Sequence, residues 1–479
     1  MNTRHSRNIT CVCSLIALGL VTLMAACTSR PPPPPPVSSP AAMPVPLSPP
    51  APSPMAMPAP PPTPPPVPVA MPLNEAILKA ANDLFSKVPL PSAELGVAGK
   101  RVVVIDPLVD GVTGVQSNVT AFIAARIVEL VRTSYPQFEI QPFAAASVAQ
   151  SPLVLIGTFA GVNTQSQVTV PPEAFRIWLT MADLQTGTIV SKGKTHATLE
   201  GVDAWPTAYF QESPVWTKDP VVDGYIKTCQ ESKVGDAINP VYAAHLVAEI
   251  VISAAIQAYN SQRYWEALDL YQRALRTPAG EQLRVYSGLY LAHWKLGHRD
   301  DAAQAFGKMI TYGLAQEHLT VKFLFKPGST ALWSDAPSRE PHLMWLQQIA
   351  QHTTQQNVCL EIIGHTSRTG PEPLNERLSL RRAEYIQERL EAEAPPLRNR
   401  TITSGKGSRE NLIGTATDDA RDALDRRVEF NVIRCGSGAS ATPLLQSFPS
   451  LALQHARPLR IVGDVSQVLI PDQRGRPNS

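Results

Sequence analysis

A short polar loop follows two isoleucines in the segment IIGHTSRTG, residues 362–370. His365, Thr366, Ser367 and Arg368 stand between two glycines in this loop. A polar loop at the end of a strand is a frequent place for a binding site, because a rigid scaffold positions its side chains. We therefore predict that this loop takes part in binding a ligand.

Catalytic and metal-binding roles are not supported by the residue pattern. His365 has no second histidine or cysteine nearby in the sequence that is placed as a ligand. GxSxG, HExxH, Walker and Rossmann patterns are all absent from the sequence, and SGKG at 404–407 is interpreted as a strand-end turn. Asp106 and Asp183 are interpreted as turn and strand-end residues. We predict no enzyme activity, no metal site and no cofactor.

The sequence around Cys27 resembles a bacterial lipoprotein signal peptide with its lipobox. Arg4 and Arg7 precede an apolar run, Cys11 to Leu23, which is short for a transmembrane span. The run leads into LMAAC, where small residues precede Cys27. The resemblance implies cleavage before Cys27 and acylation of that cysteine, with palmitate among the lipids. No Asp follows the cysteine, which favours the outer membrane; an ordinary secretory signal is the alternative.

Export predicts an oxidising compartment for the cysteines that remain. Cys229, Cys359 and Cys435 lie outside the signal region, so one disulfide and one spare thiol are the most they can form. CxxC spacing does not occur among them, and neither a zinc site nor a thioredoxin-like site is indicated.

Composition separates a spacer from the folded sequence. Of the 47 prolines, 22 lie within residues 28–73, and this segment is almost wholly Pro, Ala, Ser, Val and Met. Such a segment favours polyproline II and would reach on the order of 140 Å if fully extended at ~3.1 Å per residue. A ligand for a proline-binding domain is the alternative. The formal net charge of +2 does not indicate nucleic-acid binding.

Two different patterns occupy the middle of the chain. VVVID, LIGTF and LTMADLQTG, with a helix over 118–134 and a hairpin turn at Gln185–Thr186–Gly187, predict a small α/β domain. It resembles the periplasmic domains of FlgO/LpoB/CsgG-like lipoproteins. Residues 242–315 are predicted as helical and repeat a pattern in which Ala267 and Ala302 match. This spacing resembles tetratricopeptide (TPR) repeats, which implies either a partner groove or a connector.

The last folded segment alternates strands and helices. Strands are predicted over 321–325, 358–365, 401–408 and 426–434, and helices over 342–353 and 373–393. The resulting order, β-α-β-α-β-β, indicates a two-layer α/β sandwich. The fold class is therefore α/β multidomain: an N-terminal α/β sandwich, a TPR-like helical connector and this C-terminal sandwich.

Four motifs in the C-terminal segment occur in the order that is typical of one family. IIGHTxxxG, LNERLSLRRAEYI, GKGxxENL and DRRVEFNVI together resemble the OmpA-like peptidoglycan-binding domain over about 321–435. The resemblance implies non-covalent binding of a peptidoglycan stem peptide. In this family an Asp after GHT and an Arg of the LSxxRA helix hold the diaminopimelate group, whose ammonium and carboxylate suit such a clamp.

Carried over to this chain, the family positions give the predicted peptidoglycan-binding residues. The helix residues correspond to Asn375 and Arg382, and Arg426 adds a second cationic wall; Thr366 belongs to the GHT motif. The family Asp corresponds to Ser367, so half of the ionic clamp is missing. The serine can offer only a neutral hydrogen bond in place of the charge-assisted bond of the Asp, and this replacement would weaken binding by about 1–3 kcal/mol.

The serine leaves three interpretations open: weakened binding, a stem peptide with a different third residue, or a fold kept for another partner.

The family fold also implies a disulfide between Cys359 and Cys435, because their strands would be antiparallel neighbours.

The predicted boundaries are 1–26 signal peptide, 27–73 lipidated cysteine and linker, 74–241 α/β domain, 242–315 helical region, 316–435 OmpA-like domain and 436–479 disordered tail. We expect an outer-membrane lipoprotein that faces the periplasm and links envelope layers by binding peptidoglycan. The alternative is an adaptor or regulator of an envelope machine, whose α/β and TPR-like parts bind a protein partner.

Overall fold

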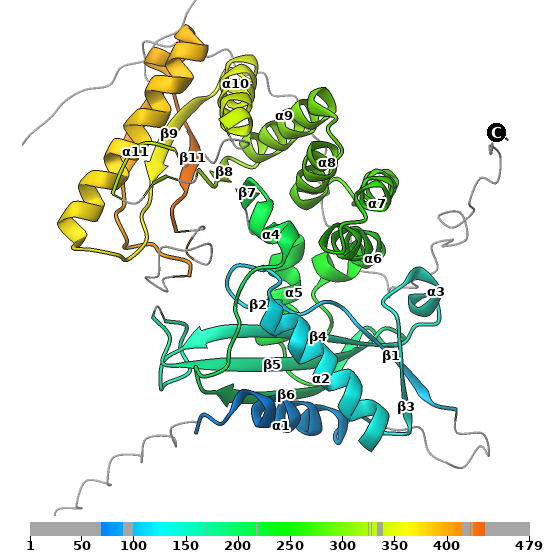
Figure 1. Cartoon of the computed structure of the whole chain (residues 1–479). Coiled ribbons are helices and arrows are strands. Elements are labelled where there is room, and N and C mark those ends of the chain that lie inside the picture. The colour runs from blue at the N-terminus through cyan, green and yellow to red at the C-terminus, as the bar shows by residue number, and fades with distance from the viewer. Residues whose placement is uncertain are drawn as a thin grey trace, which may run out of the picture. The chain divides into compact units, whose positions relative to one another are not determined.

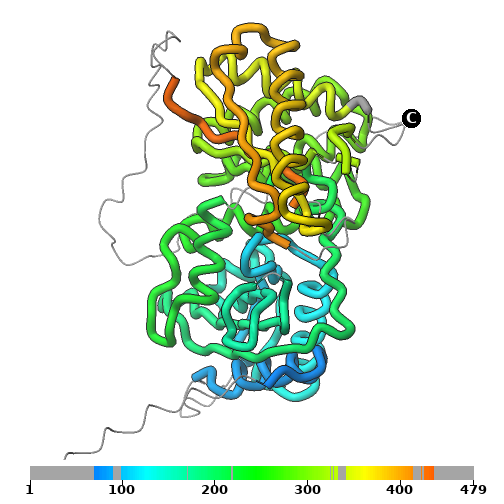
Figure 2. Tube along the Cα trace, turned by 90° about the vertical axis from the view of Figure 1, so that its left-hand side faces the viewer, coloured from blue at the N-terminus to red at the C-terminus, as the bar shows by residue number. Residues whose placement is uncertain are grey.

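A computed structural model describes residues 69–89, 99–169, 171–216, 219–323, 325–326, 328–332, 339–413, 422 and 425–435. The predictions for the signal peptide, for Cys27, for the linker up to residue 68 and for the tail after 435 lie outside these residues. Figure 1 labels the elements, and Figure 2 follows the chain from the first sheet through the helices to the second sheet.

The α/β domain contains a mixed sheet in the order β3-β1-β4-β5-β6, and β2 pairs with β4. The strand bounds are β1 Arg101–Ile105, β2 Val109–Asp110, β3 Phe138–Gln141, β4 Leu153–Val162, β5 Ala174–Asp183 and β6 Thr188–Ala197. β3, β1 and β4 are parallel, whereas β4, β5 and β6 are antiparallel. The predicted hairpin is confirmed, with Gly187 at a φ of 70° in its turn.

Helices cover both faces of this sheet because successive strand residues point to opposite sides. Val103 packs with α1 (Leu73–Phe85) and α2 (Asn118–Ser134). Val104 packs with α5 (Pro220–Gln230) and α6 (Pro240–Asn260). Short helices α3 (Ala145–Val148) and α4 (Ala208–Glu212) lie in the connections.

Helix α6 joins two cores. Its Tyr242, Leu246 and Ile250 face the first sheet, whereas Ile252 and Ile256 pack with the following helices. A helix that is apolar all round is buried on several sides. Among the described residues, α6 is also the helix long and apolar enough to cross a membrane, and half of its apolar window is buried inside the protein.

The helical region continues with α7 (Tyr264–Arg276), α8 (Leu283–Lys295) and α9 (Arg299–Ala315). The matched alanines, Ala267 and Ala302, are both fully buried. Tyr271 and Phe306, which follow them at the same spacing in the repeat, are also fully buried. The helices therefore bury the residues that the repeat pattern selected. Membership of the TPR class stays a prediction.

The second sheet has the order β10-β9-β11-β8-β7. Its elements are β7 Val215–Trp216, β8 His318–Val321, α10 Arg339–Gln355, β9 Cys359–Gly364, α11 Glu372–Glu393, a 3-10 turn Pro395–Asn399, β10 Thr401–Gly405 and β11 Val428–Ile433. β9 and β10 are parallel, and β11 is antiparallel to both β9 and β8. The predicted β-α-β-α-β-β order is confirmed from β8 to β11.

Two details of the predicted sheet are wrong. The first strand spans His318–Val321 rather than 321–325, and just after it the Lys322 ammonium donates to the carbonyls of Phe210 and Gln211. In addition, β7 extends the sheet beyond β8 from a segment that precedes the helices. A two-residue strand has too little sequence to show a period.

A buried ion cluster ties α5, α6 and α8 together. Arg284 Nε lies 3.0 Å from Asp219 Oδ2, and Arg284 Nη2 lies 2.8 Å from Glu249 Oε1. Asp219 also caps α5 by accepting from Val221 and Val222. Although burial opposes the charge, the two carboxylates outweigh it and raise the pKa of Arg284.

Candidate binding site beside the second sheet

Two glycines allow α11 to pack with its backbone against the second sheet. A Cβ on Gly364 would lie 2.0 Å from the Ser379 carbonyl oxygen, and one on Gly405 would lie 2.6 Å from the Leu380 amide nitrogen. Ser379 is fully buried, and its Oγ accepts from the Gly407 amide at 2.9 Å. The loops that follow β9 and β10 are therefore held against the first half of α11.

The GHTS part of the polar loop is buried rather than exposed. His365, Thr366 and Ser367 expose 1, 2 and 5% of their surface. The His365 amide donates to the Arg427 carbonyl at 3.1 Å, and the Thr366 amide donates to the Gly407 carbonyl at 2.9 Å. Backbone bonds to two neighbouring segments thus fix the loop, which preorganises the site.

His365 belongs to a small ionic group behind the loop. Its Nε2 lies 3.5 Å from Glu429 Oε1, and Arg427 Nε donates to the same oxygen at 2.7 Å. Burial lowers the pKa of His365. Burial would raise the pKa of Glu429, but His365 and Arg427 outweigh it and lower that pKa to about 2. The group stabilises the loop and β11.

Arg382 is held by the segment that follows the predicted strand 321–325. It exposes 2% of its surface, and its Nε and Nη2 donate to the carbonyls of Ser329 and Lys326 at 3.1 and 3.2 Å. The guanidinium carbon lies 4.8 Å from the centre of the Phe325 ring. Phe325, Lys326 and Ser329 are site residues that the sequence analysis missed. Of these three, only Phe325 lies within the predicted strand 321–325, and no sequence signal pointed to Lys326 or Ser329.

Asn375 joins the loop to α11, and Arg426 lies on the segment before β11. Asn375 Nδ2 donates to the Gly370 carbonyl at 3.3 Å, which joins the end of the loop to α11. Arg426 exposes 7% of its surface and follows the fully buried Asp425. Asp425 Oδ1 accepts from the amides of Leu412 and Ile413 at 2.6 and 3.1 Å. The Asp at this motif position therefore caps a turn.

Besides the two His365 ring nitrogens, two polar atoms at the loop lack a hydrogen-bond partner among the described residues. Thr366 Oγ1 and Asn411 Oδ1 are buried in this state, while Asn411 Nδ2 holds the Thr366 carbonyl at 2.8 Å. Buried polar groups are normally satisfied, and exceptions ask for an explanation such as a ligand. Of the five predicted residues, Thr366 and Ser367 lie in the loop, Asn375 and Arg382 lie on α11, and Arg426 lies on the segment before β11; their joint role in binding stays a prediction.

A disulfide closes the sheet at its other end. Cys359 at the start of β9 is bonded to Cys435, and their Cα atoms are 5.3 Å apart. Cys229 remains a free, buried thiol.

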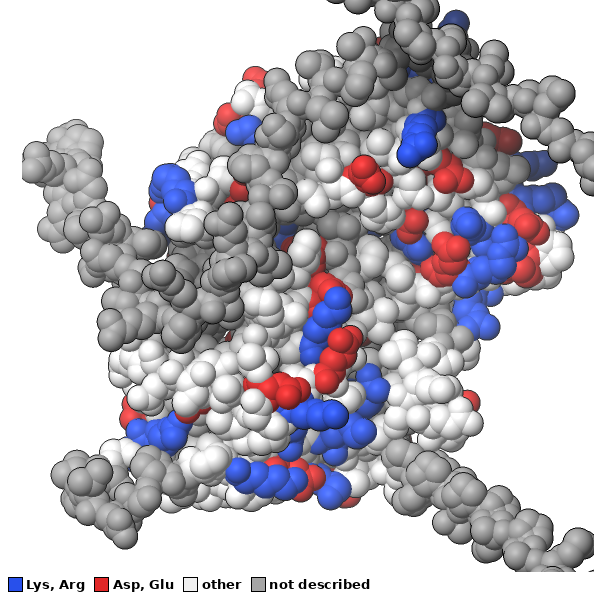
Figure 3. All heavy atoms as spheres, turned by 180° about the vertical axis from the view of Figure 1, so that it is seen from behind, with Lys and Arg blue, Asp and Glu red and all other residues white. Residues whose placement is uncertain are grey.

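On the face drawn in Figure 3, basic and acidic side chains are interspersed.

Comparisons with known proteins give one family match. Residues 324–424 match the model of the OmpA family. The periplasmic domain of MotB from Helicobacter pylori is 15% identical, with coverage of 25% of this chain and 76% of that chain and a TM-score of 0.21. The cell wall anchor of the type VI secretion system from Pseudomonas aeruginosa is 22% identical, with coverage of 24% of this chain and 80% of that chain and a TM-score of 0.20. The peptidoglycan-associated lipoprotein from Burkholderia pseudomallei is 20% identical, with coverage of 25% of this chain and 93% of that chain and a TM-score of 0.21. No curated protein matches the chain.

Proposed function

We propose, from the OmpA-family domain that the chain carries at residues 324–424, that this protein is an outer-membrane lipoprotein that binds peptidoglycan without covalent attachment. Cys27 would carry the lipid, and residues 28–73 would span the distance from the membrane to the folded part in the periplasm. The proposal includes no catalysis and no cofactor.

The observation that carries the proposal is the buried Arg382 at the family position. Its guanidinium is held by carbonyls of a loop, Lys326 and Ser329. A carboxylate is a stronger acceptor than a neutral carbonyl, so the acid group of a stem peptide can compete for these donors. Thr366 Oγ1 and Asn411 Oδ1 provide further polar partners for the same peptide.

Ser367 sets the expected strength of binding. In place of an Asp, its hydroxyl can accept from an ammonium but carries no charge, which costs about 1–3 kcal/mol. The lipid anchor offsets this weakness, because tethering raises the effective concentration of the domain at the wall. We therefore infer weak intrinsic binding that is sufficient beside the wall.

Cosedimentation of residues 28–479 with purified sacculi tests the proposal. The whole mature chain is used because a fragment starting at 316 would lack β7. Arg382→Ala should remove most of the sedimented protein, whereas Arg381→Ala, on the exposed side of the same helix, should not. Arg382→Lys separates loss of the fork-shaped donor from loss of charge, and circular dichroism confirms that each variant is folded. Failure of the wild-type chain to sediment would overturn wall binding.

Ser367→Asp tests the missing half of the clamp. The added carboxylate should increase affinity for sacculi about tenfold to a hundredfold, if the bound group is an ammonium. Unchanged or reduced binding would favour a different third residue in the stem peptide.

The membrane assignment has its own test. Cys27→Ala should prevent incorporation of labelled palmitate and release the protein from the outer-membrane fraction. An unchanged fractionation would contradict lipid anchoring.

A second candidate function is an adaptor whose α/β and helical parts hold a protein partner. One observation favours it: helices α6–α9 and the second sheet share a hydrophobic core, so a partner bound to these helices would be held beside the wall-binding domain. Cross-linking in cells should then identify a partner that is lost when the helices' exposed residues are changed.

A further inference from the structure

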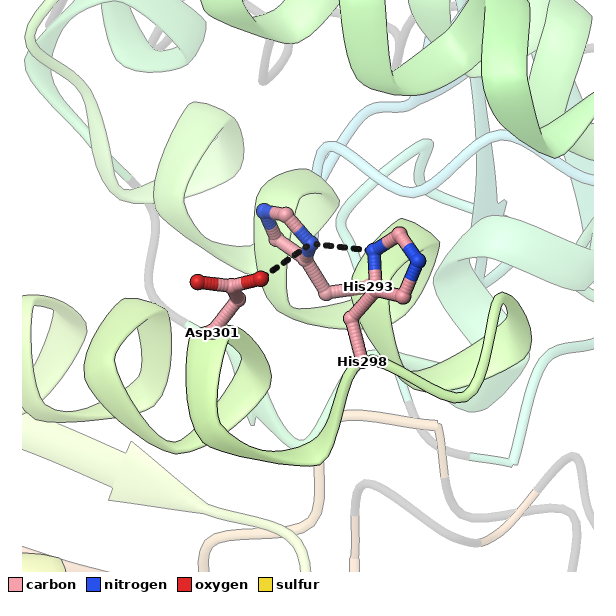
Figure 4. A group of neighbouring side chains, drawn as sticks. All are labelled: His293, His298 and Asp301. Atoms are coloured by element: carbon pink, nitrogen blue, oxygen red, sulfur yellow. Dashed lines mark hydrogen bonds and ion pairs between the residues drawn. The ribbon is translucent and has the colours of Figure 1, made fainter.

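Two histidines and an aspartate meet at the corner between α8 and α9, outside the site described above (Figure 4). His293 Nδ1 lies 3.4 Å from His298 Nδ1 and 3.8 Å from Asp301 Oδ2. The ligand atoms of all three residues lie within 4.8 Å of one another. Two nitrogens bound at about 2.0–2.1 Å to one tetrahedral metal ion are separated by a distance close to that between the imidazoles.

The backbone brings these side chains together. His293 belongs to the last turn of α8, His298 precedes α9, and Asp301 lies in the first turn of α9. Gly297 takes a φ of 80°, which reverses the chain, and the His298 amide donates to the His293 carbonyl at 2.9 Å. The Trp265 ring packs against His298 with 5.2 Å between ring centres. The cluster therefore depends on a fixed corner rather than on flexible side chains.

The surroundings leave the cluster open to an ion. Both histidines are partly buried, whereas the Asp301 side chain is 58% exposed, so solvent reaches one side. The two basic residues nearest in sequence have other partners. Lys295 pairs with Glu212. Arg299 donates to the Trp294 carbonyl, and its guanidinium stacks on the Trp294 ring.

We propose that His293, His298 and Asp301 form a site for a divalent transition metal ion of the Zn²⁺ class, with water completing the coordination. Imidazole nitrogens favour Zn²⁺, Cu²⁺ and Ni²⁺, whereas Mg²⁺ and Ca²⁺ prefer all-oxygen sites. The bound ion joins the end of α8 to the start of α9 and stabilises that corner. This site departs from the sequence-based prediction of no metal, although all three ligands lie within one short segment.

Equilibrium dialysis of the tag-free chain 28–479 against Zn²⁺ tests the site. One ion per chain is expected, together with a rise in melting temperature that grows with the Zn²⁺ concentration. Co²⁺ should give the visible absorption of a low-symmetry nitrogen–oxygen site, and Mg²⁺ should give neither effect. The tag is removed because added histidines would bind the same ions.

Asp301→Asn is the most informative variant, because the exposed side chain is removed as a ligand without disturbing the core. Zn²⁺ affinity should fall at least tenfold, and His298→Ala should abolish the Co²⁺ spectrum. His245→Ala is the matched control, since His245 is a partly buried histidine on another helix. Equal Zn²⁺ binding by the wild type and both ligand variants, or absence of binding by the wild type, would overturn the proposal.

Discussion

Arg284 and Arg382 differ in the partners that hold them in the part of the chain that the structure describes. Arg284 donates to carboxylates on two helices, Asp219 at the start of α5 and Glu249 within α6. Arg382 donates to backbone carbonyls of the loop that contains Lys326 and Ser329. The carboxylates that pair with Arg284 belong to packed helices, so they cannot move away without disrupting the hydrophobic core. The carbonyls that accept from Arg382 belong to a loop, and a ligand's carboxylate can replace them. The Arg284 contacts hold three helices together, whereas the Arg382 contacts hold a loop against α11.

Removing Arg284 should have the largest effect on stability. Arg284→Met would leave Asp219 and Glu249 as uncompensated charges in a buried site, which should cost about 3–5 kcal/mol of unfolding free energy. Urea denaturation measures the change. Arg263→Met, which breaks an exposed pair with Glu266, should cost less than about 1 kcal/mol. Similar losses for the two variants would contradict the structural role of the Arg284 cluster.

Loss of the disulfide should come next. The Cys359–Cys435 bond closes a segment with a sequence separation of 76. Replacing both residues with Ser should lower the unfolding free energy by about 2–4 kcal/mol. A Cys229→Ser variant is the control, because that thiol is free. Equal melting temperatures with and without a reductant would show that the bond does not constrain the sheet in solution.

Gly364→Ala should separate the helix from the binding loop. The new methyl group would meet the Ser379 backbone at 2.0 Å, so α11 must shift at a cost of about 2–3 kcal/mol. Gly370→Ala meets open space and should cost only about 1 kcal/mol, through its φ of 90°. Binding to sacculi should fall further for Gly364→Ala than for Gly370→Ala. The reverse order would contradict the role assigned to this close packing.

The smallest effect is expected from Glu429→Gln and depends on pH. The folded pKa of Glu429 is about 2, below its usual 4.5, so its ionic contribution is fully present above pH 4.5 and is lost as the pH falls to about 2. The variant should lose about 1–3 kcal/mol at pH 7 and match the wild type near pH 2. Glu388→Gln, at an exposed position of α11, is the matched control for the change of side chain. A constant difference across this range would argue against the ionic group.

Sequence reasoning succeeded where the signal is local or repeated in a motif. The alternating β5–β6 hairpin, the helix over 118–134 and the order of elements from β8 to β11 follow from periodicity and turn residues. The motif IIGHT also identified the loop whose glycine the α11 packing requires. Such features depend on neighbouring residues, which a single sequence contains.

Other features arise from residues far apart in the chain. β7 joins β8 across the whole helical region, and Lys322, just after β8, donates to carbonyls of α4. The partners of Arg284 and of Arg382 likewise come from distant segments.

The amino-acid sequence alone determined the kinds of element, their order and the candidate loop, because hydrophobic period and turn chemistry act locally. Tertiary structure decided which distant segments supply the partners of Arg284 and Arg382. Burial makes an unpaired polar group costly, so each charged side chain takes the partner that long-range packing brings within reach.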